Sequence, residues 1–213
     1  MRPPLLSYIA MASSVFPLTI GLRHWKTLDK PLRYFTLFLL LTVLQIGLEY
    51  YLGRIKASTH LLSDYYRSIE VTFLLLLFRQ FILPQIKNRI VFSFLAFYFC
   101  LWLVVSQYFY TPDHLNIPMA VTARILLVSC AMIVLYSLVH KTSAFLIPIY
   151  KQYIFWIAIG VLTYCTGTFM VLSLGNEILK YGADYFIAMW HINWTFFILS
   201  NMFFSWSFIV ATK

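Results

Sequence analysis

Four ionisable side chains lie inside stretches of the sequence that are otherwise almost entirely apolar: Glu49, Glu70, Arg124 and His191. Carboxylates can accept hydrogen bonds, bind a cation or relay a proton; a guanidinium can neutralise a carboxylate; an imidazole can titrate or bond a ligand. Each group is costly in hydrocarbon unless it is paired, neutralised or in contact with water. These four residues are therefore the first candidates for a functional site.

Further polar residues share helix faces with one another at spacings of three, four, seven or eight residues. They are Thr42, Gln45 and Glu49; Arg67 and Glu70; Tyr164 and Thr168; His191 and Thr195; Asn193 and Asn201. Such spacings place side chains in a stripe that must face other helices, because lipid offers no hydrogen-bond partner. The predicted ligand-binding set is Glu49, Glu70, Arg124, His191, Tyr164, Thr168, Gln45 and Asn193.

The elements that must hold these residues follow from the composition. The chain of 213 residues is 62% hydrophobic and 11% charged, with a mean hydropathy of +0.81. A soluble domain needs more charge to cover its surface, whereas a helix of about 20 apolar residues crosses a bilayer. Seven such stretches follow one another: 5–22, 33–53, 65–83, 90–110, 117–139, 152–175 and 186–210. We predict an all-α bundle of seven transmembrane helices, a single integral membrane domain over residues 1–213.

The first stretch admits two interpretations. It begins MRPPLLSYIAMASS, where a basic residue precedes an apolar run with small residues, as in a signal peptide. The stronger basic cluster follows the run instead of preceding it: Arg23, Lys26, Lys30 and Arg33. That order favours an uncleaved first helix with its N-terminus outside.

The remaining connections agree with this orientation. If the gaps after stretches one, three and five are cytoplasmic together with the C-terminus, that side holds ten basic residues: Arg23, Lys26, Lys30, Arg33, Arg79, Lys87, Arg89, Lys141, Lys151 and Lys213. The opposite side holds five: Arg2, Arg54, Lys56, Arg67 and Lys180. Cytoplasmic loops are enriched in positive charge, so we predict a multi-pass protein of the bacterial inner membrane with a cytoplasmic C-terminus.

With this orientation, the four ionisable residues share one layer in the outer third of the membrane. Glu49 lies roughly 6 Å and Arg124 roughly 10 Å from the outer ends of their stretches, at about 1.5 Å of rise per residue. Glu70 and His191 each lie roughly 8 Å from those ends. The groups either bond helices together with nothing bound between them, or line a cavity open to the outside.

The charges in this layer do not balance. Two carboxylates, Glu49 and Glu70, face one buried arginine, Arg124. The second carboxylate must be protonated, pair with Arg67 or a charged His191, or await a cationic or hydrogen-bond-donating ligand.

Other functional classes are not favoured by the sequence. The net charge of +9 comes from basic residues in short gaps between apolar stretches, without a nucleic-acid-binding signature, so no nucleic-acid partner is expected. Cys100, Cys130 and Cys165 stand alone in apolar stretches and are expected to be small buried residues. No HExxH, CxxC or paired-histidine spacing is present, so neither a metal nor another cofactor is predicted.

Three segments carry a resemblance to a known group of proteins: DYYRSIEVTFLLLLFR (64–79), QYIFWIAIGVLTYCTGTFMVLS (152–173) and WHINWTFFILSNMFFSWSFIV (190–210). Together they resemble short multi-pass membrane proteins of about 200–230 residues that are common in Bacteroidota. The shared positions would be Glu70, Gly160, Tyr164, Gly167, His191 and Asn201, and we assign helix packing to Gly160, Gly167 and Asn201. The group is similar in layout to the seven-helix sensory modules of membrane histidine kinases, but here the sequence ends at residue 213 without a kinase domain. The resemblance therefore implies a separate signalling partner.

The leading expectation is a non-enzymatic sensor or accessory signalling subunit that takes a small extracytoplasmic ligand between stretches two, three, five and seven. Glu49 and Glu70 would supply acceptors or negative charge, Arg124 would counter one of them, and His191 would bond the ligand or titrate. The basic inner loops, above all 23–33, would contact a membrane kinase, another signalling protein or anionic lipid. Two alternatives remain: a small-solute or proton-coupled transporter that uses Glu49 and Glu70, and an intramembrane lipid enzyme.

Overall fold

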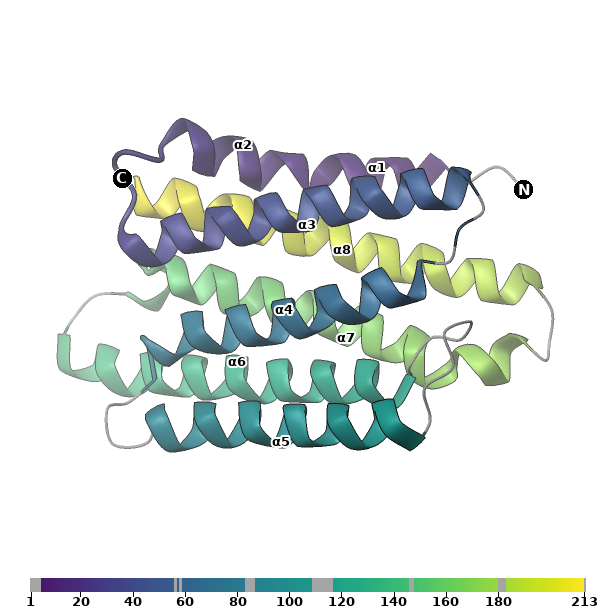
Figure 1. Ribbon diagram of the computed structural model, residues 1–213. Helices are drawn as coiled ribbons and strands as arrows, with labels where there is room; N and C mark the ends of the chain where they lie inside the picture. The colour runs from purple at the N-terminus through teal and green to yellow at the C-terminus, as the bar shows by residue number, and fades with distance from the viewer. Residues whose placement is uncertain are drawn as a thin grey trace.

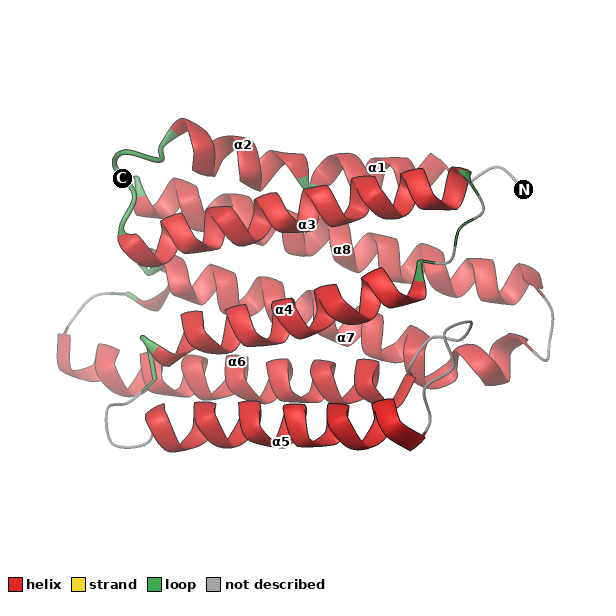
Figure 2. Ribbon diagram, viewed as in Figure 1, coloured by secondary structure: helices red, strands yellow, loops and turns green. Residues whose placement is uncertain are grey.

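The computed structural model describes residues 5–55, 57, 59–82, 87–108, 117–145, 148–179 and 183–212, and within these ranges all regular structure is helical. The helices are α1 Leu5–Ser13, α2 Val15–Arg23, α3 Lys30–Arg54, α4 His60–Arg79, α5 Lys87–Tyr108, α6 Ile117–Phe145, the short 3₁₀ helix η1 Ile149–Lys151, α7 Tyr153–Leu179 and α8 Ala183–Ala211. Helices α1 and α2 continue one another, so the described residues form seven rods. The chain reverses direction from each rod to the next (Figures 1 and 2). The predicted all-α bundle is confirmed.

Six of the seven rods are long and apolar enough to cross a membrane, which identifies a multi-pass membrane protein: α1–α2 together, α3, α5, α6, α7 and α8. The seventh, α4, has 20 residues but carries Asp64, Arg67 and Glu70. It packs between α3, α5 and α6, where Arg67 and Glu70 are buried. The least apolar rod thus turns Arg67 and Glu70 toward its neighbours, because these charged side chains need protein partners that lipid does not provide.

The first rod is interrupted at Ser14, whereas the sequence predicted one uninterrupted helix. The Ser13 and Ser14 hydroxyls bond the carbonyls of Ala10 and Met11 at 2.7 and 2.6 Å, and Pro17 in the first turn of α2 has no N–H to continue the ladder. Across the break, Asn201 Nδ2 of α8 donates to Ser13 Oγ at 2.9 Å. The first rod is therefore an integral part of the bundle, held against α8.

Helices α7 and α8 approach one another closely at two glycines. A Cβ atom added to Gly160 would collide with the Phe204 ring, and one added to Gly167 would lie 2.5 Å from Phe196 Cβ. Each glycine thus makes room for a phenylalanine of α8, and small residues at such positions are common where helices pack closely in membranes.

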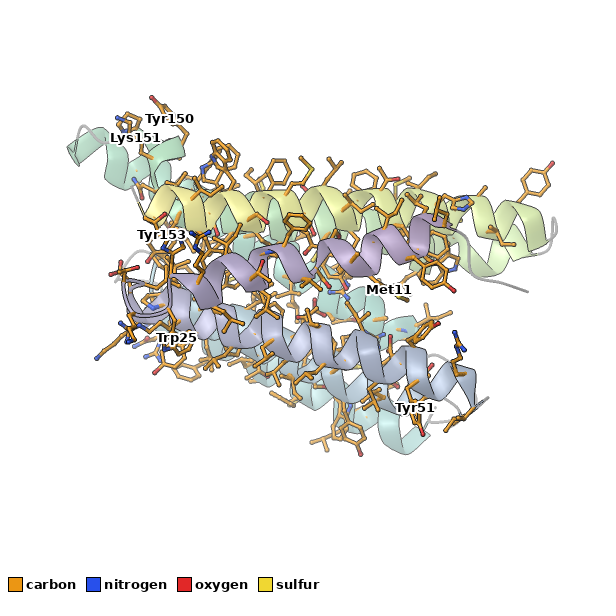
Figure 3. All side chains as sticks on the ribbon, turned by 90° about the horizontal axis from the view of Figure 1, so that it is seen from above. Met11, Trp25, Tyr51, Tyr150, Lys151 and Tyr153 are labelled. Carbon is orange, nitrogen blue, oxygen red and sulfur yellow. The ribbon has the colours of Figure 1, made fainter. Side chains whose placement is uncertain are left out.

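The two ends of the bundle differ in charge. We call the basic end the one where α2 and α8 end and α3 and α5 begin, because Arg23, Lys30, Arg89 and Lys151 gather there. Figure 3 places Trp25, Tyr150 and Tyr153 at the same end as Lys151, and Tyr51 at the other. Aromatic side chains at both ends are typical of the two membrane interfaces. Of the predicted charge count, Arg2, Lys56, Lys180 and Lys213 lie outside the described residues.

An aromatic cluster fills the bundle between its centre and the basic end. Its members pack with ring centroids 5.2 to 6.0 Å apart: Phe35, Phe38, Phe73, Phe204 and Phe208. Phe35 and Phe208 are completely buried. The outer surface is apolar as well, as lipid contact requires, and Cys100 is exposed on it. The expectation that all three cysteines are buried was therefore wrong for Cys100, because the outside of a membrane helix is as apolar as its core.

Candidate functional site

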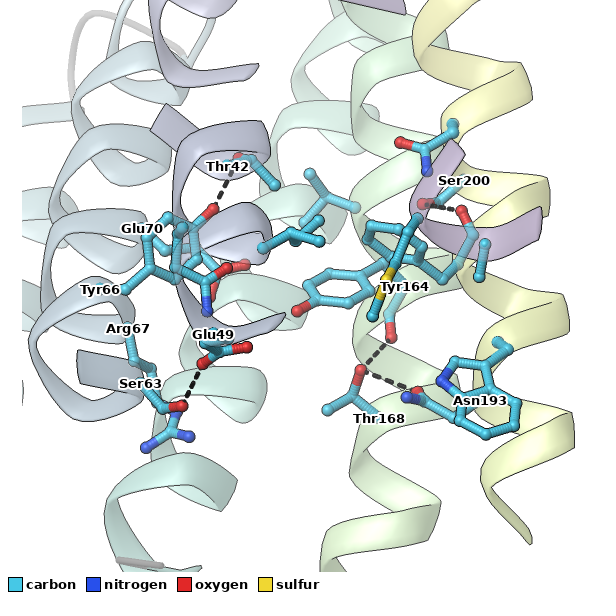
Figure 4. Close-up of a pocket in the computed structure, with 18 of the residues that line it drawn as sticks. Thr42, Glu49, Ser63, Tyr66, Arg67, Glu70, Tyr164, Thr168, Asn193 and Ser200 are labelled. Atoms are coloured by element: carbon cyan, nitrogen blue, oxygen red, sulfur yellow. Dashed lines mark hydrogen bonds between the residues drawn. The ribbon is translucent and has the colours of Figure 1, made fainter. Parts of the chain in front are cut away.

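A cavity of about 310 Å³ lies between the aromatic cluster and the end of the bundle opposite the basic end. Its walls come from α1, α3, α4, α6, α7 and α8 (Figure 4). Glu49 and Ser63 lie on one wall, and Thr168 and Asn193 lie on the facing wall. The volume is within the range of small-molecule sites, which begins at roughly 300 Å³.

The strongest contact in the cavity wall is a buried ion pair between helices α6 and α4. Arg124 Nη1 donates to Glu70 Oε2 at 2.8 Å, and Nη2 donates to the Tyr164 hydroxyl at 2.9 Å. The guanidinium also lies 4.5 Å from the centre of the Tyr164 ring. Arg124 and Glu70 are only 5% and 2% exposed, so each charge needs the other. Arg124 Nε is buried with no hydrogen-bond partner among the described residues.

The second carboxylate, Glu49, is bonded differently. The Ser63 hydroxyl donates to Glu49 Oε1, and Glu49 forms no ion pair with any described residue. Arg67, a predicted partner, instead donates to Asp64 Oδ1 at 2.6 Å on its own helix. Glu49, Glu70, Arg67 and Arg124 therefore line the cavity, while Asp64, the partner of Arg67, lies outside the lining.

Hydroxyl and amide groups complete the polar wall. Thr42 and Tyr66 share a hydrogen bond of 2.6 Å between α3 and α4, and Thr168 donates to Asn193 Oδ1 at 3.2 Å between α7 and α8. Gln45 lies on the same face of α3 as Thr42 and Glu49, and all three line the cavity.

The structure brings seven of the eight predicted ligand-binding residues to this cavity: Glu49, Glu70, Arg124, Tyr164, Thr168, Gln45 and Asn193. The eighth, His191, is half-buried beside it, with its ring 5.3 Å from that of Trp194, and does not line it. Successive helix residues differ by about 100°, so His191, two residues before Asn193, lies nearly on the opposite side of α8.

The sequence interpretation did not identify the aromatic part of the wall. Trp190, Trp194 and Phe197 line the cavity at three, one and four residues from Asn193, on the same face of α8. Their helical spacing from Asn193 was the available signal. Apolar residues are so frequent in this chain, however, that spacing alone does not distinguish residues that line a cavity from residues that contact lipid.

No protein family, curated sequence or solved structure matches this chain. Nor do the described residues bring together three His, Cys, Asp or Glu side chains that could hold a metal ion. The cavity is thus the feature of the molecule that bears most directly on function.

Proposed function

We propose that this chain is a non-enzymatic sensor or accessory signalling subunit of the bacterial inner membrane that binds a small extracytoplasmic ligand in the cavity. The proposal assumes the orientation that the charge distribution favours, with the basic end in the cytoplasm. The combination of an apolar wall with a few convergent polar groups is typical of small-molecule binding sites.

The main evidence for this proposal is that the cavity ends at the aromatic cluster. The buried charged residues of the described chain are Arg67, Glu70 and Arg124, and all three line the cavity. At the level of the cluster, the buried hydroxyls of Thr36 and Ser207 bond carbonyls of their own helices, and on α6 the Ser137 hydroxyl is buried without a partner among the described residues. A transported ion or proton needs charged or titratable groups along its route. No charged residue is buried beyond the cavity in the part of the chain that the structure describes, which favours binding without passage.

A sensor must also carry the effect of binding to the other end of the bundle. Helix α3 is suited to this, because it carries Glu49 near one end and Arg33 in its first turns. Arg33 Nε and Nη2 donate to the carbonyls of Leu28 and Lys26 at 2.8 and 3.0 Å, which ties the basic loop to the helix. A ligand that binds two arrangements of α3 unequally would thereby move this loop against a signalling partner.

Flux and crosslinking together test this function. In proteoliposomes, proton flux measured with an entrapped pH dye is expected to equal that of protein-free vesicles, for the native chain and for Glu70→Gln. A photocrosslinking residue in place of the exposed Thr27 is expected to capture one discrete membrane protein in the native membrane, whereas the same residue in place of the lipid-facing Phe97 captures none.

Three results would overturn it. Proton or solute flux that Glu70→Gln abolishes would instead establish the transporter. Lipid turnover that is lost in His191→Ala would establish the enzyme. Crosslinks to lipid alone from the residue that replaces Thr27 would contradict contact between this loop and a signalling partner.

A further inference from the structure

We infer that the ligand of this cavity is a small organic cation, an ammonium group joined to an apolar or aromatic body. This inference rests on the proposed function insofar as the cavity is a ligand site, and it adds the chemical class of the ligand.

The charge balance of the wall is the first argument. Each guanidinium already has its own carboxylate: Asp64 at 2.6 Å from Arg67, and Glu70 at 2.8 Å from Arg124. Glu49 lines the cavity with a hydroxyl donor and without a basic partner among the described residues. Glu49 is half-buried, so its carboxylate is less well solvated than in water, and a bound ammonium would offset that cost. An anionic ligand would have to displace a carboxylate from an arginine.

The aromatic wall is the second argument. Trp190, Trp194 and Phe197 of α8 line the cavity, and Phe38 and Tyr66 do so from α3 and α4. Aromatic faces attract organic ammonium groups and also bury the apolar body that such a ligand carries. A bare metal cation fits less well, because the described residues gather no three metal-ligating side chains there.

Three probes of one shape and different charge test the inference: phenethylamine, which is a cation at neutral pH, 2-phenylethanol, which is neutral, and 3-phenylpropionate, which is an anion. Binding to the purified full chain in lipid nanodiscs is followed by calorimetry and by tryptophan fluorescence, to which Trp190 and Trp194 report directly. Phenethylamine is expected to bind about tenfold more tightly than 2-phenylethanol, and 3-phenylpropionate more weakly than either.

Variants assign this preference to Glu49. Glu49→Gln keeps the shape and the Ser63 contact but removes the charge, and is expected to abolish the difference between amine and alcohol. Asp29→Asn, the matched control, removes a carboxylate at the basic end, outside the cavity lining, and is expected to keep the preference. Thermal melting of each variant confirms that it is folded.

Equal binding of amine and alcohol, a preference for the anion, or an amine preference that survives in Glu49→Gln would overturn the inference. Each of these results leaves the sensor proposal standing, because that proposal is decided by flux and crosslinking. Binding of none of the three probes would also overturn the cation class.

Discussion

Replacing Arg124 by methionine is expected to lower the free energy of unfolding by about 3–5 kcal/mol, the usual cost of leaving one buried charge without its partner. Glu70 is 2% exposed and its only ion pair among the described residues is the one with Arg124. The Tyr164 hydroxyl also loses its donor. The measurement is equilibrium unfolding of the purified protein in mixed micelles, followed by circular dichroism as the denaturing detergent is increased.

The double variant, in which Glu70→Met accompanies Arg124→Met, is the matched control. Replacing both members of a buried pair by apolar side chains is often nearly neutral. The double variant is therefore expected to regain most of the lost stability, with a residual cost of about 1 kcal/mol for the unpaired tyrosine. If the single and double variants are equally unstable, the two side chains are not coupled and the ion pair is not what holds α4 against α6.

Truncation of Phe35 to alanine is expected to have the second large effect, a loss of about 3–5 kcal/mol. Phe35 is completely buried and lies within 5.2 to 6.0 Å, ring centre to ring centre, of Phe38, Phe204 and Phe208. Its removal leaves a space between α3 and α8 that lipid cannot fill, so the three ring contacts that Phe35 makes in the cluster are lost. The same unfolding experiment measures this change.

Phe97→Ala is the control for that variant. Phe97 is 57% exposed on α5, where acyl chains can fill the space that the ring vacates. Its truncation is expected to change stability by less than about 0.5 kcal/mol, as is usual for surface positions. Similar losses for the two variants would mean that the cluster is not a tightly packed barrier beneath the cavity.

Much of the fold could be predicted from the sequence because the bilayer imposes it. Stretches of about 20 apolar residues have to be helices, since every backbone polar group must be satisfied within the segment. Helix α4 was predicted although its charged residues make it less apolar than the other six rods. The break at Ser14 was not predicted, because serine hydroxyls can bond the helix backbone with or without interrupting it.

The candidate site was predictable in its members but not in its pairing. Polar residues in a membrane helix must face protein, so the stripe of Thr42, Gln45 and Glu49 pointed inward whatever its partners were. Arg124 could have paired with Glu49 or with Glu70, and the outcome depends on how α6 packs against α3 and α4. The spacing of residues within one helix does not predict how that helix packs against others. Arg67 was a predicted partner of the second carboxylate. It pairs instead with Asp64, which lies three residues away on the same helix.

The position of His191 could also be predicted only in part from the sequence. Its depth placed it in the predicted polar layer, but its rotation about α8 turns it away from the cavity, and Trp190 and Trp194 occupy that wall. Depth follows from sequence position, whereas rotation depends on the packing of α8 against α7 at Gly160 and Gly167.

The central claim is that a cavity opens toward the outside and is closed toward the cytoplasm by the aromatic cluster. The most direct test is thiol labelling with a membrane-impermeant cationic reagent, in a Cys100→Ser background, of Gln45→Cys in the cavity and Leu32→Cys beyond the cluster. In right-side-out vesicles Gln45→Cys should react and Leu32→Cys should not, and inverted vesicles should leave Gln45→Cys unmodified. An unreactive Gln45→Cys in right-side-out vesicles, or one that reacts equally from both sides, would contradict the account.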